Sequence, residues 1–156
     1  MTGSVTHARK RVVVVGEDDE PIAFLLRDSF NDEPGYQAVV VPDGALVLDT
    51  VRQVHADVLI LDIMMPGLSG FEVYDRIRAD PTIRDMPVLF MSAATATYED
   101  DFKRRGIRDV LAKPFVSREV THIVAAGLVS WLTRRELKKR GIADRWAVEQ
   151  WNAAAG

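Results

Sequence analysis

The chain has 156 residues, a formal net charge of −3 and a hydrophobic fraction of 47%. This length provides one globular domain with a real core and a short appendage, but not two full domains. The charge balance offers no overall basic field for nucleic acid, and the absence of cysteine excludes disulfides, thiolate metal sites and thiol nucleophiles. The N-terminal stretch lacks the apolar region of a signal peptide, and the apolar runs are too short to span a membrane. We therefore expect a cytoplasmic protein with no membrane partner.

The first half of the chain alternates predicted strands with predicted helices. Val12 to Val15 is a β-branched run too short for an amphipathic helix, so it predicts a buried strand. The acids Glu17 to Glu20 follow, and apolar residues at helical spacing then predict a helix that carries Ile22 to Phe30. The next predicted elements are a strand at Tyr36–Val41, a helix at Gly44–Val54, a strand at Asp57–Asp62 and a helix at Phe71–Ala79.

The same alternation continues through the second half. Val88–Met91 predicts a fourth strand, and the helix expected near Tyr98–Arg105 ends at Gly106, a residue suited to a left-handed cap. A short strand at Asp109–Ala112 then leads into a long fifth helix. Five such units indicate an α/β fold with a parallel sheet covered on both faces, in which the chemistry gathers at the carboxyl ends of the strands.

Polar side chains stand at four of these strand ends. Glu17 and Asp18 follow the first strand, and Asp62 ends the third. Converging carboxylates repel one another unless a hard cation such as Mg²⁺ compensates their charge. A carboxylate can also attack phosphorus when donors meet the charge on the phosphoryl oxygens, and Ser92 and Lys113 supply such donors. Any one of these residues alone would more commonly be a turn, cap or solvated loop residue, so the joint pattern carries the argument.

The joint pattern resembles the receiver domain of response regulators over roughly Val12 to Leu132. The matching segments, in chain order, are Glu17-Asp18, Asp62-Ile63-Met64-Met65-Pro66-Gly67-Leu68-Ser69-Gly70, Ser92-Ala93 and Lys113-Pro114-Phe115. The resemblance implies a flavodoxin-like (βα)5 doubly wound parallel sheet with strand order 2-1-3-4-5. It also implies a phosphorylation-dependent signalling switch rather than a turnover enzyme.

The resemblance further implies a role for each site residue. Asp62 would be the phosphoacceptor, with a sensor histidine kinase or a phosphotransfer protein as the donor. Mg²⁺, or Mn²⁺ in its place, would be held by Asp18, Asp62 and the backbone carbonyl of Met64, with Glu17 acting mainly through water. Lys113 would pair with the acyl phosphate, and Ser92 would hydrogen-bond a phosphoryl oxygen. The acidic run leaves one alternative open, because the pair could be shifted by one residue to include Asp19.

Three positions depart from or refine the family pattern. Receivers commonly carry an aromatic residue three positions before the lysine, whereas this chain has Val110, so the usual aromatic readout is in doubt. The positions that tune the lifetime of the phosphoryl group are Met64 and Ala94, neither of which can orient a water molecule. We therefore expect slow to intermediate self-dephosphorylation. The family also has a cis peptide bond at the position of Lys113-Pro114.

The expected domain organisation is a frayed N-terminus at 1–10, a receiver domain at 11–132 and a helical C-terminal extension at 133–156. The basic run at Arg134–Arg140 could contact nucleic acid, but the segment is too short for a helix-turn-helix domain, and a basic helix end also suits the negative end of the helix dipole, so we expect a solvated helix end. The tryptophans of the extension and of the preceding helix need a surface to bury against: Trp131, Trp146 and Trp151. They could fold back onto the receiver, form a homodimer through the fifth helix and the extension, or bind another partner.

Two other functions fit parts of the pattern. A phosphatase with an aspartate nucleophile would normally carry its acceptor in a DxD-like motif after the first strand, together with a substrate-selecting cap domain, whereas the candidate Asp62 follows the third strand. A pseudo-receiver would use the fold as a phosphate-independent interaction or dimerisation module. The presence of all five pocket residues favours the phosphoacceptor interpretation over both.

Overall fold

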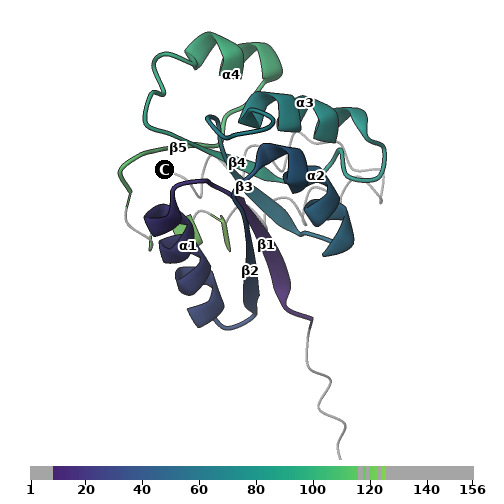
Figure 1. The fold of residues 1–156 in the computed structure, drawn as a ribbon, viewed down its shortest axis with the longest axis vertical. Helices are drawn as coiled ribbons and strands as arrows, with labels where there is room; N and C mark the ends of the chain where they lie inside the picture. The colour runs from purple at the N-terminus through teal and green to yellow at the C-terminus, as the bar shows by residue number, and fades with distance from the viewer. Residues whose placement is uncertain (1–8, 116–117, 119, 123, 126–156) are drawn as a thin grey trace, which may run out of the picture.

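The computed structural model describes residues 9–115, 118, 120–122 and 124–125. The predictions for residues 1–8, for the extension at 133–156 and for the three tryptophans lie outside the described residues. Within them, five strands form one sheet: β1 (Arg11–Gly16), β2 (Tyr36–Val41), β3 (Val58–Asp62), β4 (Val88–Ser92) and β5 (Val110–Ala112). All neighbouring strands are parallel, and their order is β2-β1-β3-β4-β5 (Figure 1). The predicted flavodoxin-like strand order is confirmed.

Four helices connect the strands: α1 (Glu20–Asp32), α2 (Gly44–Gln53), α3 (Gly70–Ala79) and α4 (Glu99–Arg105). The first three begin at a polar side chain that accepts a hydrogen bond from a backbone amide of the first turn, namely Asp19, Asp43 and Ser69. Gly106 ends α4 with a φ of 66°, the left-handed cap that the sequence predicts. Residues 118, 120–122 and 124–125 are also helical.

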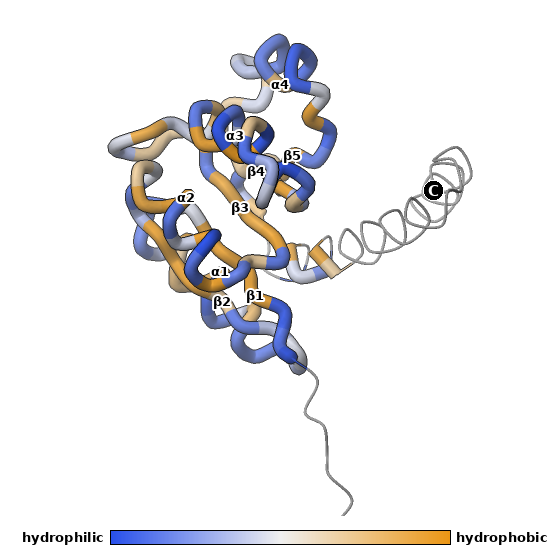
Figure 2. The backbone as a smooth tube through the Cα atoms, turned by 90° about the vertical axis from the view of Figure 1, so that its right-hand side faces the viewer, coloured by the Kyte–Doolittle hydropathy of each residue, from blue (hydrophilic) through white to orange (hydrophobic). Residues whose placement is uncertain are grey.

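The core is divided into two layers by the sheet. Alternate strand residues point to opposite faces, so Val14 and Leu61 pack with side chains of α2, α3 and α4, whereas Val15 and Ile60 pack with α1 and with Val120. Figure 2 shows the strands as a hydrophobic centre and α4 as mainly hydrophilic. Both faces of the sheet are therefore covered.

Some element boundaries differ from the predicted ones by one residue. The third strand begins at Val58 rather than Asp57, whose carboxylate accepts a hydrogen bond from the Val12 amide at 2.8 Å and pairs with Arg9 at 3.2 Å. The third helix begins at Gly70 because the preceding Ser69 caps it. The cap shows why hydrophobic spacing alone could not locate the start of this helix.

Candidate functional site

The candidate site lies at the carboxyl edge of the sheet. Glu17 directly follows β1, Asp62 ends β3, Ser92 ends β4 and Lys113 directly follows β5. The amide of Lys113 donates to the carbonyl of Ser92 at 2.9 Å, which extends the pairing of β4 with β5 to the site itself. Because all the strands are parallel, residues far apart in the sequence meet at one edge of the sheet.

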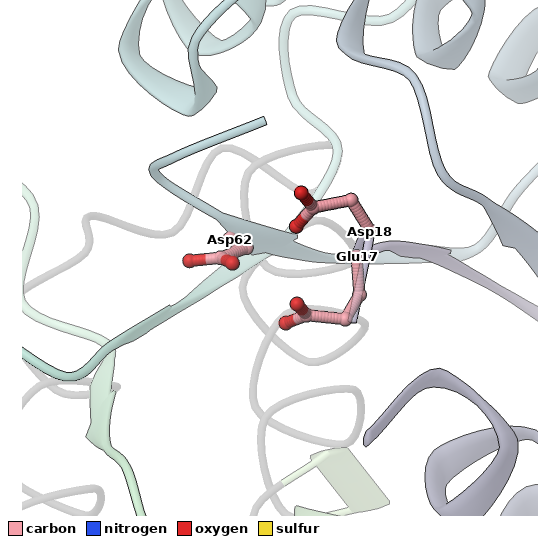
Figure 3. A group of neighbouring side chains, drawn as sticks. All are labelled: Glu17, Asp18 and Asp62. Atoms are coloured by element: carbon pink, nitrogen blue, oxygen red, sulfur yellow. The ribbon is translucent and has the colours of Figure 1, made fainter. Parts of the chain in front are cut away.

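Three carboxylates gather at the ends of β1 and β3. Glu17, Asp18 and Asp62 each offer one oxygen atom, and these atoms all lie within 4.8 Å of one another. Figure 3 shows the side chains of Asp18 and Glu17 above and below the end of their strand, with Asp62 on the neighbouring strand beside them. Glu17 and Asp62 are buried, whereas Asp18 is exposed. Oxygen donors of this kind and spacing fit a hard divalent cation such as Mg²⁺.

Lys113 provides the positive charge that balances this cluster. Its Nζ donates to Glu17 Oε2 at 2.8 Å and to Asp62 Oδ2 at 3.1 Å. The lysine side chain is 14% exposed, and the side chains of Glu17 and Asp62 are 0% and 12% exposed. The peptide bond between Lys113 and Pro114 is cis, as the family resemblance implies. One ammonium group thus faces two buried carboxylates.

Burial changes the acid–base properties of this pair. It raises the pKa of Glu17 to about 7, although the hydrogen bond from Lys113 acts in the opposite direction, and the neighbouring Asp62 charge raises it further. For Lys113, burial acts to lower the pKa, but the hydrogen bonds to Glu17 and Asp62 outweigh burial and the pKa is raised. The lysine therefore stays charged, and Glu17 is the group that can exchange a proton near neutral pH.

Backbone amides orient the remaining oxygen atoms of the site. Asp62 Oδ1 accepts from the amide of Ile63 at 2.8 Å, and Glu17 Oε1 accepts from the amide of Asp19 at 3.1 Å. Ser92 Oγ accepts from the amide of Ala94 at 3.0 Å. Asp19 itself caps α1 through the amide of Ile22. The structure therefore brings Asp18 into the carboxylate cluster and gives Asp19 a structural contact.

Two glycines, Gly44 and Gly70, lie so close to the backbone of the loop that follows Asp62 that neither position has room for a side chain. A Cβ atom at Gly70 would lie 2.3 Å from the carbonyl oxygen of Asp62. A Cβ atom at Gly44 would lie 1.9 Å from the carbonyl oxygen of Leu68. Both contacts are with backbone, which cannot rotate away. The loop is consequently held from two sides, and within it the side chain of Met64 remains 71% exposed.

A groove opens beside the carboxylates, and no pattern in the sequence predicts it. Its lining includes Asp18, Met64, Ser69, Phe71 and Tyr98. Phe71 lies in α3, Tyr98 directly precedes α4, and the two rings meet edge to face with centroids 5.6 Å apart. Hydrophobic spacing alone could not show this contact, because it depends on how the loop before α4 returns to α3.

The sequence places this chain in a known family of signalling domains. The family described as "Response regulator receiver domain" matches residues 12–125. The chain belongs to this family. It is a receiver domain of the kind found in the response regulators of two-component systems, and such domains are signalling switches.

Curated relatives resemble the chain over about half of their own length. The transcriptional regulatory protein YrkP of Bacillus subtilis is 36% identical over 134 residues, which cover 83% of this chain and 54% of YrkP. The DNA-binding response regulator MtrA of Mycobacterium tuberculosis is 33% identical over 121 residues, which cover 77% of this chain and 51% of MtrA.

Solved receiver domains share the fold. The receiver domain of the Francisella response regulator 1452 superposes with a TM-score of 0.67 at 28% identity, covering 76% of this chain and 97% of that domain. The receiver domain of the sensor histidine kinase PA1611 from Pseudomonas aeruginosa, solved with a magnesium ion in its active site cleft, gives a TM-score of 0.68 at 23% identity. That match covers 76% of this chain and 98% of that domain.

Among the described residues, no helix is both long and apolar enough to cross a membrane.

Proposed function

We propose that this receiver accepts a phosphoryl group on Asp62 in a Mg²⁺-dependent reaction. The single observation that carries the proposal is the meeting of Asp62 with Glu17, Asp18 and Lys113 at one edge of the sheet. Bringing several carboxylates together in a partly buried place is unfavourable for stability. Such clusters are therefore found mainly at functional sites. The donor is a sensor histidine kinase or a phosphotransfer protein, as membership of the family implies.

The metal site of the proposal uses oxygen atoms from two strand ends. Asp18, Asp62 and the backbone carbonyl of Met64 hold Mg²⁺, and Glu17 acts mainly through water. Mn²⁺, which also prefers oxygen ligands, serves the same site. The donor set of this chain supports the proposal, as does the magnesium ion in the PA1611 receiver, which has the same fold. When bound, the metal neutralises charge on the phosphoryl oxygens.

Asp62 is the nucleophile in the proposed transfer. One of its carboxylate oxygens attacks the phosphorus of a phosphohistidine, a P–O bond forms, and the P–N bond breaks. The electron pair of that bond returns to the imidazole nitrogen of the donor. Lys113 exchanges its contact with Asp62 for one with a phosphoryl oxygen, and Ser92 turns its hydroxyl toward another. The charge of Lys113 and the fixed position of the acceptor loop lower the barrier.

The proposed output is a change of protein–protein contacts. MtrA is described as DNA-binding, but that name concerns a whole protein, of which the similar region covers about half. The net charge of −3 gives this chain no overall basic field, so we assign it no nucleic-acid contact of its own. For the extension, a homodimer through the fifth helix and the extension stands beside folding back onto the receiver and binding another partner. Measuring the oligomeric state in solution before and after truncation at Thr133 tests the homodimer, and an unchanged oligomeric state excludes it.

Incubation with acetyl phosphate and Mg²⁺, followed by intact-mass measurement, tests the proposed acceptor. We expect one phosphoryl adduct that disappears when Mg²⁺ is chelated before the reaction and when Asp62→Asn replaces the acceptor. No adduct on the wild-type chain contradicts the phosphoacceptor function and favours a pseudo-receiver. An adduct that survives Asp62→Asn contradicts the assigned residue.

A further inference from the structure

The methionines that the structure describes differ sharply in exposure. Met64 is 71% exposed, whereas Met86 and Met91 are 6% and 0% exposed. Met65 is partly buried and packs against the core on the side of the sheet that α2 and α3 cover. Met1 lies outside the described residues. Because an oxidant must reach the sulfur atom before it can react, Met64 is the described methionine that is most open to oxidation.

The side chain of Met64 lies beside the proposed site of phosphoryl transfer. It lines the groove next to the carboxylates, together with Asp18 and the apolar side chains of Met65 and Phe71. Asp18 belongs to the carboxylate cluster with Asp62, so this groove borders the place of a phosphoryl group on the acceptor. A thioether is only a weak hydrogen-bond acceptor. The sulfur of Met64 therefore gives a water molecule in the groove no firm contact.

The backbone that carries Met64 is held in place without help from its side chain. The amide of Gly44 donates to the carbonyl of Pro66 at 2.9 Å, and the amide of Gly70 donates to the carbonyl of Ile63 at 2.8 Å. A side chain as exposed as that of Met64 contributes little to the core, and changes at such surface positions usually have small effects on stability. A chemical change at this sulfur atom therefore alters the groove and leaves the loop folded.

We propose that Met64 is an oxidation site, at which a hydroperoxide shortens the lifetime of the phosphoryl group on Asp62. This inference rests on the proposed phosphoacceptor function and adds a chemical input that ends the phosphorylated state. The sulfur lone pair attacks one oxygen of hydrogen peroxide, an S–O bond forms and the O–O bond breaks. The hydroxide that leaves takes the proton of the new S–OH group, so the products are methionine sulfoxide and water. The sulfur loses two electrons, and the peroxide gains them.

The sulfoxide changes the hydrogen bonding of the groove. Its oxygen carries partial negative charge and accepts hydrogen bonds, which the thioether does only weakly. A water molecule held by this oxygen lies beside the phosphoryl group in a fixed orientation, and a positioned water attacks phosphorus faster than one from bulk solvent. Hydrolysis of the acyl phosphate therefore speeds up several-fold and returns Asp62 to its free carboxylate. Reduction of the sulfoxide restores the thioether and the longer lifetime.

Hydrogen peroxide treatment of the full chain, followed by peptide mapping, tests where oxidation begins. We expect one added oxygen atom on Met64 well before Met65, Met86 or Met91 gains one. The melting temperature of the chain oxidised at Met64 should stay near that of the untreated chain. Oxidation that reaches the buried methionines first overturns the proposal.

The lifetime of the phosphoryl group tests the consequence of the oxidation. Treated and untreated chains are loaded with acetyl phosphate and Mg²⁺, the donor is removed, and the intact mass is followed over time. We expect the adduct to decay several-fold faster on the chain oxidised at Met64. Treatment of that chain with a methionine sulfoxide reductase before loading should restore the slow decay.

Met64→Leu and Met65→Leu are matched variants, because each removes one sulfur atom from the same loop. Each variant is compared with its own untreated form. Peroxide should leave the adduct lifetime of Met64→Leu unchanged and should still shorten that of Met65→Leu. Met64→Leu thereby separates oxidation of Met64 from oxidation of Met1 or of any other residue.

Three results overturn the oxidation site and leave the phosphoacceptor function standing. They are an unchanged adduct lifetime in the Met64 sulfoxide, a peroxide effect that persists in Met64→Leu, and loss of phosphoryl uptake on the oxidised chain. The last result would mean that the sulfoxide disturbs the acceptor rather than the hydrolysis. Absence of an adduct on the untreated chain overturns the phosphoacceptor function and this inference together.

Discussion

The two sides of the candidate site differ in how firmly they are built. On one side, every residue of β3 is buried, and the loop after Asp62 is packed against backbone at Gly44 and Gly70. On the other side, β5 has three residues, none of them fully buried, and α4 buries one. Asp62 and Glu17 belong to the first side, and Lys113 to the second. The difference suggests that the domain holds its acceptor still and lets the opposite edge respond.

The largest expected effect is a difference between the two sides in how much a core substitution lowers the free energy of unfolding. Leu59→Ala in β3 removes a side chain that is 0% exposed, and we expect a loss of about 2–5 kcal/mol in the free energy of unfolding. Leu111→Ala in β5 removes a half-buried side chain, and we expect a loss of about 1 kcal/mol. Denaturant unfolding measures both. Equal losses would mean that the β5 edge is as firmly packed as the centre.

The second prediction uses the proton on Glu17. Burial raises its pKa to about 7, above the ordinary 4.5, so without metal the folded chain favours the protonated form, and ionisation reduces stability as the pH rises through that range. The charge of ionised Glu17 attracts Mg²⁺ through water, so protonation of Glu17 opposes metal binding. Mg²⁺ affinity should therefore rise roughly tenfold between about pH 6 and pH 8. Calorimetric titration measures it.

Glu17→Gln is the control for this pH dependence. The amide cannot ionise, so the variant should bind Mg²⁺ more weakly and with a flat pH profile over the same range. A variant that keeps the wild-type slope would place the titrating group elsewhere.

The lifetime of the acyl phosphate tests the side chains that flank Asp62. Met64 and Ala94 are exposed and cannot orient a water molecule, so the phosphorylated chain should persist for minutes or longer after removal of the donor. Met64→Asn places a polar amide there and should speed hydrolysis several-fold. Intact-mass measurement over time follows both. Loss from the wild-type chain within seconds would contradict the expectation.

The smallest effect concerns an ion pair far from the site. The hydrogen bonds from Arg52 and then from Thr82 lower the pKa of Asp80 to about 2, against an ordinary 3.8. Because the folded pKa is depressed, the stabilisation is complete above the ordinary value and is lost as the pH falls toward 2. Asp80→Asn should melt slightly below wild type at neutral pH, and the two melting temperatures should converge in acid. A constant gap would show that Asp80 stabilises the fold without its charge.

The sequence pattern predicted a parallel sheet and the meeting of the site residues. Alternating strands and helices indicate such a sheet, and residues such as Asp62 and Ser92 at the ends of its strands must share an edge. The family resemblance supplied the strand order and the roles of these residues. What the resemblance assigns to Met64 and to the metal stays a prediction.

Other features depend on side-chain geometry that no sequence spacing contains. Spacing could not show that Lys113 would contact Glu17 as well as Asp62, because the contact depends on how the chain leaves β5. The pairing of Arg105 with Asp75 joins residues 30 positions apart on two helices, and its partner could have been any nearby acid. Spacing could not show which of Asp18 and Asp19 joins the carboxylate cluster, because the answer depends on Asp19 capping α1.

The central claim is that Asp62 takes the phosphoryl group while Lys113 and the neighbouring acids compensate its charge. The most direct measurement is peptide mapping of the chain after reaction with acetyl phosphate and Mg²⁺, with the acyl phosphate trapped by borohydride reduction. We predict one modified residue, Asp62, and strong loss of modification in Lys113→Ala. Modification at another carboxylate, or none with Mg²⁺ present, would contradict the account.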